Sequence, residues 1–186
     1  EGEACLVVDS LRRNGYEVTE CIRNRAPAIA EALHAESYRI LHLAGHGVHE
    51  YPLRAGIESC ALCKQPVSGG SQLVSGMIIG KGILLTPADV EQMRRVPDLV
   101  FINCCHLGRV DPTPEARAAD LPAWNQLAAN LAAQFIRMGV KVVVAAGWAV
   151  DDQAAGTFAR RFYDELMAGV PFGRAVLEAR REAYRR

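Results

Sequence analysis

Two apolar stretches of the chain each end on a side chain that can act as a base or a nucleophile. Residues 40–46, ILHLAGH, end at His46 before Gly47, and residues 99–105, LVFINCC, end at Cys105. An imidazole beside a thiol can take its proton, and the thiolate then attacks an acyl carbon. A glycine N–H can approach a substrate closely and stabilise the oxyanion. If the two stretches lie side by side, these residues predict nucleophilic catalysis.

The two stretches belong to a chain in which apolar strands alternate with amphipathic helices. Apolar runs predict buried strands at 38–44, 98–105 and 140–148, and the segment YEVTECI predicts a short strand at 16–22. Helical periodicity predicts one helix that ends at Asn14-Gly15 and others at 27–35, 125–139, 153–168 and 171–184. Continuously apolar strands separated by helices are typical of a mostly parallel sheet covered by helices on both faces.

Two local signals add detail between the second and third helices. The segment 76–85, with Gly80-Lys81-Gly82 at its centre, predicts a hairpin. Thr86 and Pro87, followed by Asp89, predict the cap, the first turn and the acidic start of a short helix. The hairpin therefore leads directly into a helix that precedes the strand of Cys105.

Further candidates follow the third buried strand. In open α/β sheets, ligands bind outside the carboxyl ends of the strands. Trp148, Asp151 and Asp152 lie just past such an end. An aromatic wall with a carboxylate at its base suits a long cationic side chain, because the stem packs on the indole and the head meets the acid. At least one of the two aspartates also suits the N-cap of the next helix.

The composition argues against several classes of protein. The 186 residues carry 21 basic and 21 acidic side chains, and 50% of them are hydrophobic. A chain of this length closes a single core, and zero net charge without a basic stripe argues against direct binding of nucleic acid. No apolar run reaches the ~20 residues that a membrane helix needs. Six cysteines, two of them adjacent at Cys104 and Cys105, favour reduced thiols and a cytoplasmic location.

The motifs around His46 and Cys105 resemble those of a known family. HLAGHG and FINCCHLG are similar to the paired His-Gly and Cys blocks of caspase-like (clan CD) cysteine peptidases, with Cys105 in the place of the nucleophile and Cys104 as a small packing residue. The whole chain resembles the CHAT family, bacterial caspase-like domains often attached to tetratricopeptide repeats. Four blocks carry this likeness: LHLAGHGVHEYPLRAGI, LLTPADV, VVVAAGWAVDD and FYDELMAGVPFGRAVLEAR. A longer, cysteine-containing segment at 58–76 and the CCH triplet depart from the family pattern.

The resemblance implies a fold and a site. The fold is a caspase-like three-layer sandwich, a mostly parallel central sheet flanked by helices with a small hairpin insertion. His46 and Cys105 are the catalytic residues, and the N–H groups of Gly47 and Cys105 hold the oxyanion. Likeness to separase favours Asp152 as the acid of the substrate pocket beside Trp148, with Asp151 as the helix cap. No metal and no organic cofactor are needed.

The resemblance also implies a biological setting. The substrate is a protein or peptide that is cut after a basic residue, in a bacterial defence or regulated cell-death system. Residues 1–186 form a single CHAT domain, and the abrupt start at Glu1 suggests a fragment of a longer multidomain protein. An upstream sensor or repeat region, in the same polypeptide or complex, is the expected regulatory partner. We expect no nucleic acid and no membrane as partners.

Other interpretations of the same residues remain open. A catalytically silent CHAT scaffold could bind partner proteins through the same cleft, and a flavodoxin-like binding module could carry the cysteines by chance. Cys60 and Cys63 have the spacing of half a zinc site, but no second pair stands at a suitable distance. Phosphatase chemistry fails because neither Val110 nor Asp111, six residues after the paired cysteines, is the arginine it requires.

Overall fold

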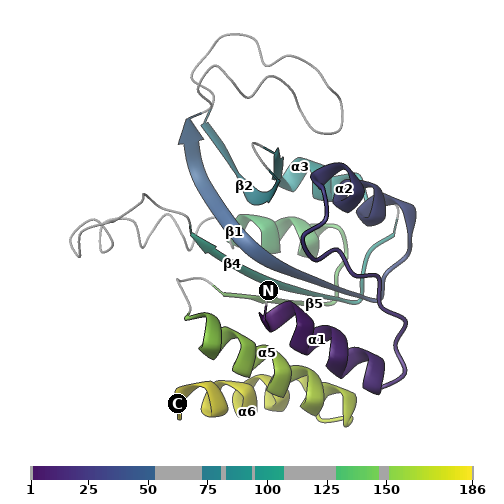
Figure 1. Cartoon of the computed structure of the whole chain (residues 1–186), viewed down its shortest axis with the longest axis vertical. Helices are drawn as coiled ribbons and strands as arrows, with labels where there is room; N and C mark the ends of the chain where they lie inside the picture. Colours follow the sequence, from purple (N-terminus) through teal and green to yellow (C-terminus); the bar gives the residue numbers. More distant parts are fainter. Residues whose placement is uncertain are drawn as a thin grey trace, which may run out of the picture. The chain divides into compact units, whose positions relative to one another are not determined.

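The structure of the chain is a computed structural model that describes residues 2–52, 73–80, 83–93, 95–106, 129–146 and 151–185. At positions 49–52, 73, 87, 105 and 106 the description covers the backbone but not the side chain. The chain forms two compact units: a sheet unit, Arg23–Ala149, and a helical unit made of Glu1–Ile22 and Val150–Arg186. Figure 1 shows the elements of both units.

The sheet unit is built on five strands in the order β3-β2-β1-β4-β5. These strands are β1 (Ile40–Pro52), β2 (Leu73–Gly80), β3 (Ile83–Leu85), β4 (Leu99–His106) and β5 (Val142–Ala145). β1, β4 and β5 run parallel to one another, whereas β2 is antiparallel to β1 and β3 is antiparallel to β2 (Figure 1). The three parallel strands are the three that the apolar runs predicted.

The sheet differs from the predicted one in two ways. It is mixed rather than mostly parallel, because two of its pairings are parallel and two are antiparallel. The predicted hairpin, β2–β3, is confirmed, but it continues the main sheet. β1 does not end at Ala44 as predicted but runs on to Pro52, and its second half pairs with β2 from His46↔Ile78 to Pro52↔Leu73. The additional residues of β1 supply the backbone groups with which β2 pairs.

One predicted strand is wrong. Residues 16–22 form no strand in the structure, and all of them are exposed or half-buried. Their residue types are compatible with a strand, but a strand also needs a hydrogen-bonding partner. The segment instead connects α1 (Gly2–Arg13) to α2 (Ala26–Ala35), two helices that the sequence predicted.

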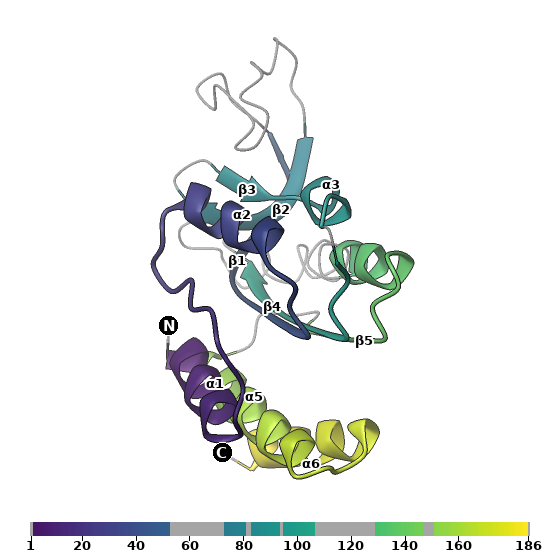
Figure 2. The same cartoon turned by 90° about the vertical axis from the view of Figure 1, so that its right-hand side faces the viewer.

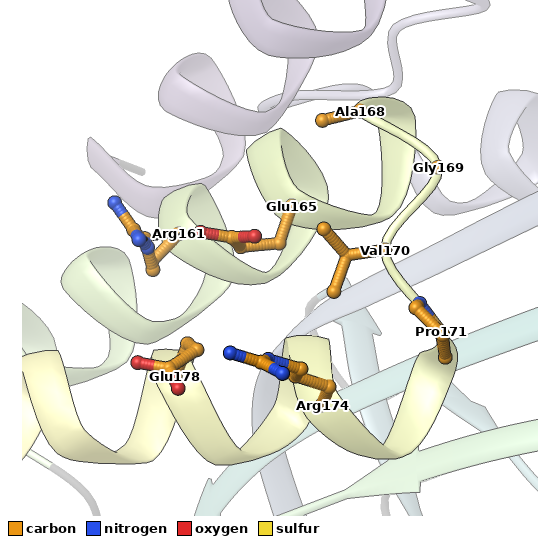
Figure 3. Close-up of a pocket in the computed structure, with 8 residues that line it drawn as sticks. All are labelled: Arg161, Glu165, Ala168, Gly169, Val170, Pro171, Arg174 and Glu178. Carbon is orange, nitrogen blue, oxygen red and sulfur yellow. Dashed lines mark ion pairs between the residues drawn. The ribbon is translucent and has the colours of Figure 1, made fainter.

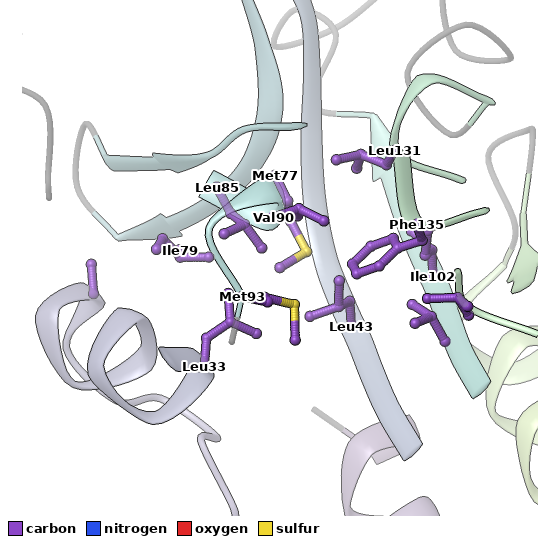
Figure 4. Packing of buried hydrophobic residues seen from close by; sticks show 13 residues of the cluster. Leu33, Leu43, Met77, Ile79, Leu85, Val90, Met93, Ile102, Leu131 and Phe135 are labelled. Carbon is purple, nitrogen blue, oxygen red and sulfur yellow. The ribbon is translucent and has the colours of Figure 1, made fainter. Parts of the chain in front are cut away.

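The core of the sheet unit lies on one face of the sheet. α2, α3 (Pro87–Glu91) and the helix at 129–137 lie on this side (Figure 2). Leu43, Met77 and Ile102 project from the strands and pack in one cluster with Leu33 of α2 and Phe135 of the helix at 129–137 (Figure 4). Full burial of an apolar side chain of this size contributes about 1.5–3 kcal/mol. This single cluster holds the strands and three helices together.

The start of α3 follows the predicted cap. The Thr86 hydroxyl accepts from the Asp89 backbone N–H at 3.4 Å, and an Asp89 carboxylate oxygen accepts from the Thr86 backbone N–H at 2.8 Å. Together these bonds form a capping box, which satisfies donors that a helix start leaves unpaired. The buried Val90 and Met93 follow at once, so the cap fixes where the chain turns back into the core.

A cluster of charged side chains joins the starts of the three parallel strands. Asp98, just before β4, pairs with Lys141 before β5 at 2.8 Å and with Arg39 before β1 at 3.3 Å. The backbone N–H of Asp98 also donates to the Arg39 carbonyl at 2.8 Å. Hydrogen bonds from Lys141 and Arg39 hold the pKa of the Asp98 carboxyl below its ordinary value. We call these three residues the Asp98 clasp.

The helical unit consists of α1, α5 (Asp152–Met167) and α6 (Phe172–Tyr184). Phe162 and Tyr163 of α5 are fully buried, and desolvation raises the pKa of the Tyr163 hydroxyl far above its ordinary value. The Ser10 hydroxyl of α1 donates to the Asp164 carboxylate of α5 at 2.8 Å. None of the helices that the structure describes has both the length and the apolar character needed to span a bilayer.

Gly76 is expected to tolerate no side chain. A Cβ at this position stands 2.6 Å from the backbone oxygen of Leu85 in β3, closer than carbon and oxygen can approach. Gly76→Ala should therefore lower the free energy of unfolding by about 1–3 kcal/mol, because β3 must shift. Urea unfolding followed by tryptophan fluorescence measures this in the sheet unit, whose range contains both Trp124 and Trp148.

Gly173→Ala is the matched control for this substitution. A Cβ at Gly173 meets nothing within 4 Å, so the variant should be as stable as the parent or slightly more stable. Equal stability of the two alanine variants would show that the close approach of Gly76 to β3 does not constrain the sheet.

The Asp98 clasp predicts a pH-dependent contribution to stability. A carboxyl whose folded pKa is depressed stabilises the protein above its unfolded pKa of about 3.9, and this contribution is lost as the pH falls through the folded value. Asp98→Asn should lower the thermal midpoint at pH 7, and the difference from the parent should shrink below about pH 4. Asp9→Asn, at an exposed position of α1, removes the same charge without breaking an ion pair between described residues, so it serves as control. A gap that stays constant from pH 7 to pH 3 would contradict the role of the clasp.

Candidate active site

The parallel pairing of β1 with β4 makes His46 and Cys105 direct neighbours. The ladder runs in register from Ile40↔Leu99 to Gly47↔His106, and His46↔Cys105 is one of its pairs. Backbones of neighbouring strands lie about 4.8 Å apart. The two reactive residue types that end separate apolar runs are thus brought together at one place in the sheet.

Strand alternation separates the paired cysteines. Ile102 belongs to the core cluster and Cys104 packs against it, as the sequence predicted for Cys104. Successive residues of a strand point to opposite faces, so position 105 falls on the face that lies away from this core. The side chain of Cys105 is outside the described part of the chain, and its assignment as the nucleophile stays a prediction.

His46 differs from His42, which lies on the same face of β1. His46 is exposed, although Gly47 and Val48 directly after it are buried. The ring of His42 is half-buried and stacks on Phe101, with ring centroids 4.7 Å apart and an interplanar angle of 26°. This packing gives His42 a structural role. The exposed imidazole of His46 is the one that a substrate can reach.

Gly47 lies deeper in the sheet than the sequence suggested. It is buried and has register partners on both sides, Met77 in β2 and His106 in β4. Backbone groups between two paired strands normally bond within the sheet. The oxyanion role of the Gly47 N–H therefore stays a prediction that depends on how the backbone near position 106 is arranged when substrate binds.

The predicted substrate-binding residues are divided between the two units. An Asp151 side-chain oxygen accepts from the backbone N–H groups of Gln153 at 3.0 Å and Ala154 at 3.1 Å, so Asp151 is the N-cap of α5 as predicted. Asp152 is the exposed first residue of α5. Both belong to the helical unit, whereas Trp148 belongs to the sheet unit and lies outside the described residues. Their pocket stays a prediction.

Asn103 is a polar residue near the candidate pair that the sequence reasoning missed. It is the register partner of Ala44 and falls between Phe101 and Cys105 on the same face of the sheet. Its side-chain oxygen is buried. The sequence did contain a signal for this residue. In INCC, Asn103 stands two residues before Cys105, and residues two apart in a strand lie on the same face of the sheet.

Other candidate chemistry finds little support in the described part of the chain. Among these residues, no group of three or more His, Cys, Asp or Glu side chains could hold a metal ion. Cys60 and Cys63 lie outside the described residues. Cys5 is an exposed free thiol, and burial raises the pKa of the Cys21 thiol, which disfavours its reactive thiolate form.

The fold and the site together define a class: a mixed α/β protein with an exposed histidine and a cysteine paired on adjacent parallel strands. The model of the CHAT domain family matches residues 1–186, the whole chain. The chain therefore belongs to the CHAT family, whose members are generally similar to caspase-like cysteine proteases. No curated protein matches the chain.

Proposed function

We propose that this chain is a cysteine endopeptidase of the caspase-like CHAT type. One observation carries the proposal: the β1–β4 register makes His46 and Cys105 neighbours on parallel strands. Membership of the CHAT family supports it, because that family is generally cysteine protease-like. The exposure of His46 supports it further, since a base must be accessible to substrate.

The proposed reaction needs only groups of this chain and water. His46 accepts the proton of the Cys105 thiol, and the thiolate attacks the carbonyl carbon of the scissile bond. The backbone N–H groups of Gly47 and Cys105 stabilise the oxyanion. Protonated His46 then gives its proton to the departing amine, which leaves a thioester on Cys105. A water molecule, deprotonated by His46, hydrolyses the thioester and releases the new carboxyl end.

The proposed specificity is for a basic residue before the cut bond. Trp148 provides the aromatic wall and Asp152 the carboxylate of this pocket. The capping bonds of Asp151 support this division, because that side chain is already engaged with the backbone of α5. Arginine is favoured over lysine, since its planar guanidinium can bind a carboxylate through two parallel hydrogen bonds.

The proposed setting rests on the family alone. The protein is cytoplasmic, cuts a partner protein in a bacterial defence or cell-death system, and is regulated by an upstream sensor or repeat region. Residues 1–186 act as one CHAT domain of a longer polypeptide, with a caspase-like layered fold around the central sheet.

A second candidate function is a catalytically silent CHAT scaffold that binds partner proteins through the same cleft. The position of Gly47 favours it, because a glycine buried between two paired strands is poorly placed to offer its N–H to a substrate. An active enzyme requires that this part of the sheet rearrange when substrate or a regulatory region binds. The chemical reactivity of Cys105 distinguishes the two candidates.

A thiol-reactive acyloxymethyl ketone that carries arginine tests the proposal directly. We expect peptide mapping to find the label on Cys105, and His46→Ala to slow labelling by about 100-fold or more, as loss of a catalytic base does. Cys105→Ala should abolish cleavage of an arginine peptide.

Cys104→Ser is the matched control, because Cys104 packs against the core rather than facing the site. It should keep most of the labelling and cleavage. Label on Cys104, or loss of activity in a folded Cys104→Ser variant, would move the nucleophile. No labelling in the presence of intact His46 would support the silent scaffold.

The proposed pocket predicts a difference between the two neighbouring aspartates. Asp152→Asn removes a charged hydrogen bond to the substrate arginine. The lower kcat/KM should therefore correspond to a loss of about 1.5–3 kcal/mol of transition-state stabilisation. Asp151→Asn should have little effect, because asparagine caps helices as well as aspartate does. Steady-state kinetics on one arginine peptide, with reaction of Cys105 with iodoacetamide as a check of the site, measures both. A larger loss in the Asp151 variant would reassign the pocket.

A further inference from the structure

The side of α6 that points away from α5 carries an exposed apolar pair. α6 buries the small Ala175 and Ala179, whereas Leu177 is 46% exposed and Tyr184 is 94% exposed. Leu177 and Tyr184 are seven residues apart, about two helical turns, so they lie on the same side of the helix. Phe172 is also partly exposed, but its ring packs edge-on against Phe162 and so has a partner.

Arginines flank this apolar pair on both sides. Helical geometry places Arg180 on one side and Arg174, Arg181 and Arg185 on the other. Together with Leu177 and Tyr184 they form what we call the outer face of α6. Arg181 pairs with Glu178 at 3.1 Å, whereas the other three form no ion pair among the described residues.

The acidic residues of α6 do not neutralise the outer face. Glu178 and Glu182 are half-buried and lie toward its flank. Glu178 is paired with Arg181, and Glu182 is paired with Arg160 of α5 at 3.8 Å. A chain with a formal net charge of zero thus places three cations, none of them in an ion pair with another described residue, around one exposed apolar pair.

A hollow of about 600 Å³ adjoins the outer face at Arg174. Its lining includes Arg161 and Glu165 of α5, which pair with each other, and Val170 and Pro171 of the turn before α6 (Figure 3). Arg174 is the cation of this lining that has no ion-pair partner among the described residues.

We propose that the outer face of α6 docks an acidic amphipathic helix of a partner protein. Apolar side chains one heptad apart on that helix cover Leu177 and Tyr184, and its carboxylates meet Arg174, Arg180 and Arg185. A nucleic acid or an anionic lipid surface fits less well, because the carboxylates of Glu165 and Glu178 line the same hollow and repel closely spaced phosphates. The carboxylates of a helix stand at separate positions, so they can contact the arginines without approaching Glu165 and Glu178. This inference does not depend on the proposed peptidase activity.

A designed helical peptide tests the docking face. The probe is a fluorescein-labelled 18-residue helix with two leucines one heptad apart, flanked by glutamates, and its partner probe has lysines in place of the glutamates. Fluorescence anisotropy with the 186-residue chain should show saturable binding of the acidic probe, at least about tenfold tighter than that of the lysine probe. Arg180→Glu and Leu177→Ser should each weaken it about tenfold, and combined Arg174→Glu and Arg180→Glu should make the lysine probe the tighter one.

The helix at 129–137 supplies matched controls. Ile136 is 52% exposed and the neighbouring Arg137 is also exposed, so Ile136→Ser and Arg137→Glu change the same residue types outside the proposed face. They should leave binding unchanged. Equal binding of the two probes, or acidic-probe binding that survives Arg180→Glu and Leu177→Ser in folded protein, would overturn the proposal. So would tighter binding, through the same arginines, to phosphatidylserine vesicles or to single-stranded RNA.

Discussion

The register of the parallel ladder between β1 and β4 is the constraint on which the candidate site depends. It sets His46 opposite Cys105, and a slip of one residue would move a strand's side chains to the opposite face of the sheet. Two features hold this register. The core requires Leu43 and Ile102, a register pair, on the same buried face. At the start of the strands, the Arg39 carbonyl accepts from the N–H groups of both Asp98 and Leu99.

The Asp98 clasp and the candidate site lie at opposite ends of the same strands. The clasp joins the amino ends of β1, β4 and β5 with charges that water can reach. Cys105 lies near the carboxyl end of β4, where a parallel sheet offers side chains to a ligand. The apolar middle of the strands therefore lies between the Asp98 clasp, which aligns the amino ends, and the candidate catalytic residues near the carboxyl ends.

The hairpin β2–β3 changes the surroundings of His46. Because β2 pairs along the second half of β1, Gly47 and Val48 are buried and the histidine is not at a free strand end. The close approach of Gly76 to Leu85 shows how tightly β2 and β3 are joined. Any arrangement that offers the Gly47 N–H to a substrate has to be compatible with this second set of strand pairs. Whether the Gly47 N–H can bind an oxyanion thus depends on how β2 and β3 pair beside β1.

The sequence by itself determined the local elements, because their signals are local. Apolar runs located the three parallel strands, helical periodicity located the helices, and Thr86 with Asp89 located the start of α3 through a capping box that spans four residues. The N-cap of α5 was narrowed to Asp151 or Asp152 for the same reason, and the family resemblance favoured Asp151. The membership of the family was also visible in short motifs along the whole chain.

The tertiary structure decided what depends on partners distant in the sequence. The predicted strand at 16–22 does not form, whereas β1 continues past His46 to Pro52, because a strand exists only where another strand supplies hydrogen bonds. The mixed sheet and the pairing of His46 with Cys105 likewise follow from ladders between segments far apart in the chain. Composition and periodicity describe each segment alone and carry no register. From the sequence, catalysis could be predicted only if the strands of His46 and Cys105 were neighbours. The folded sheet makes them neighbours.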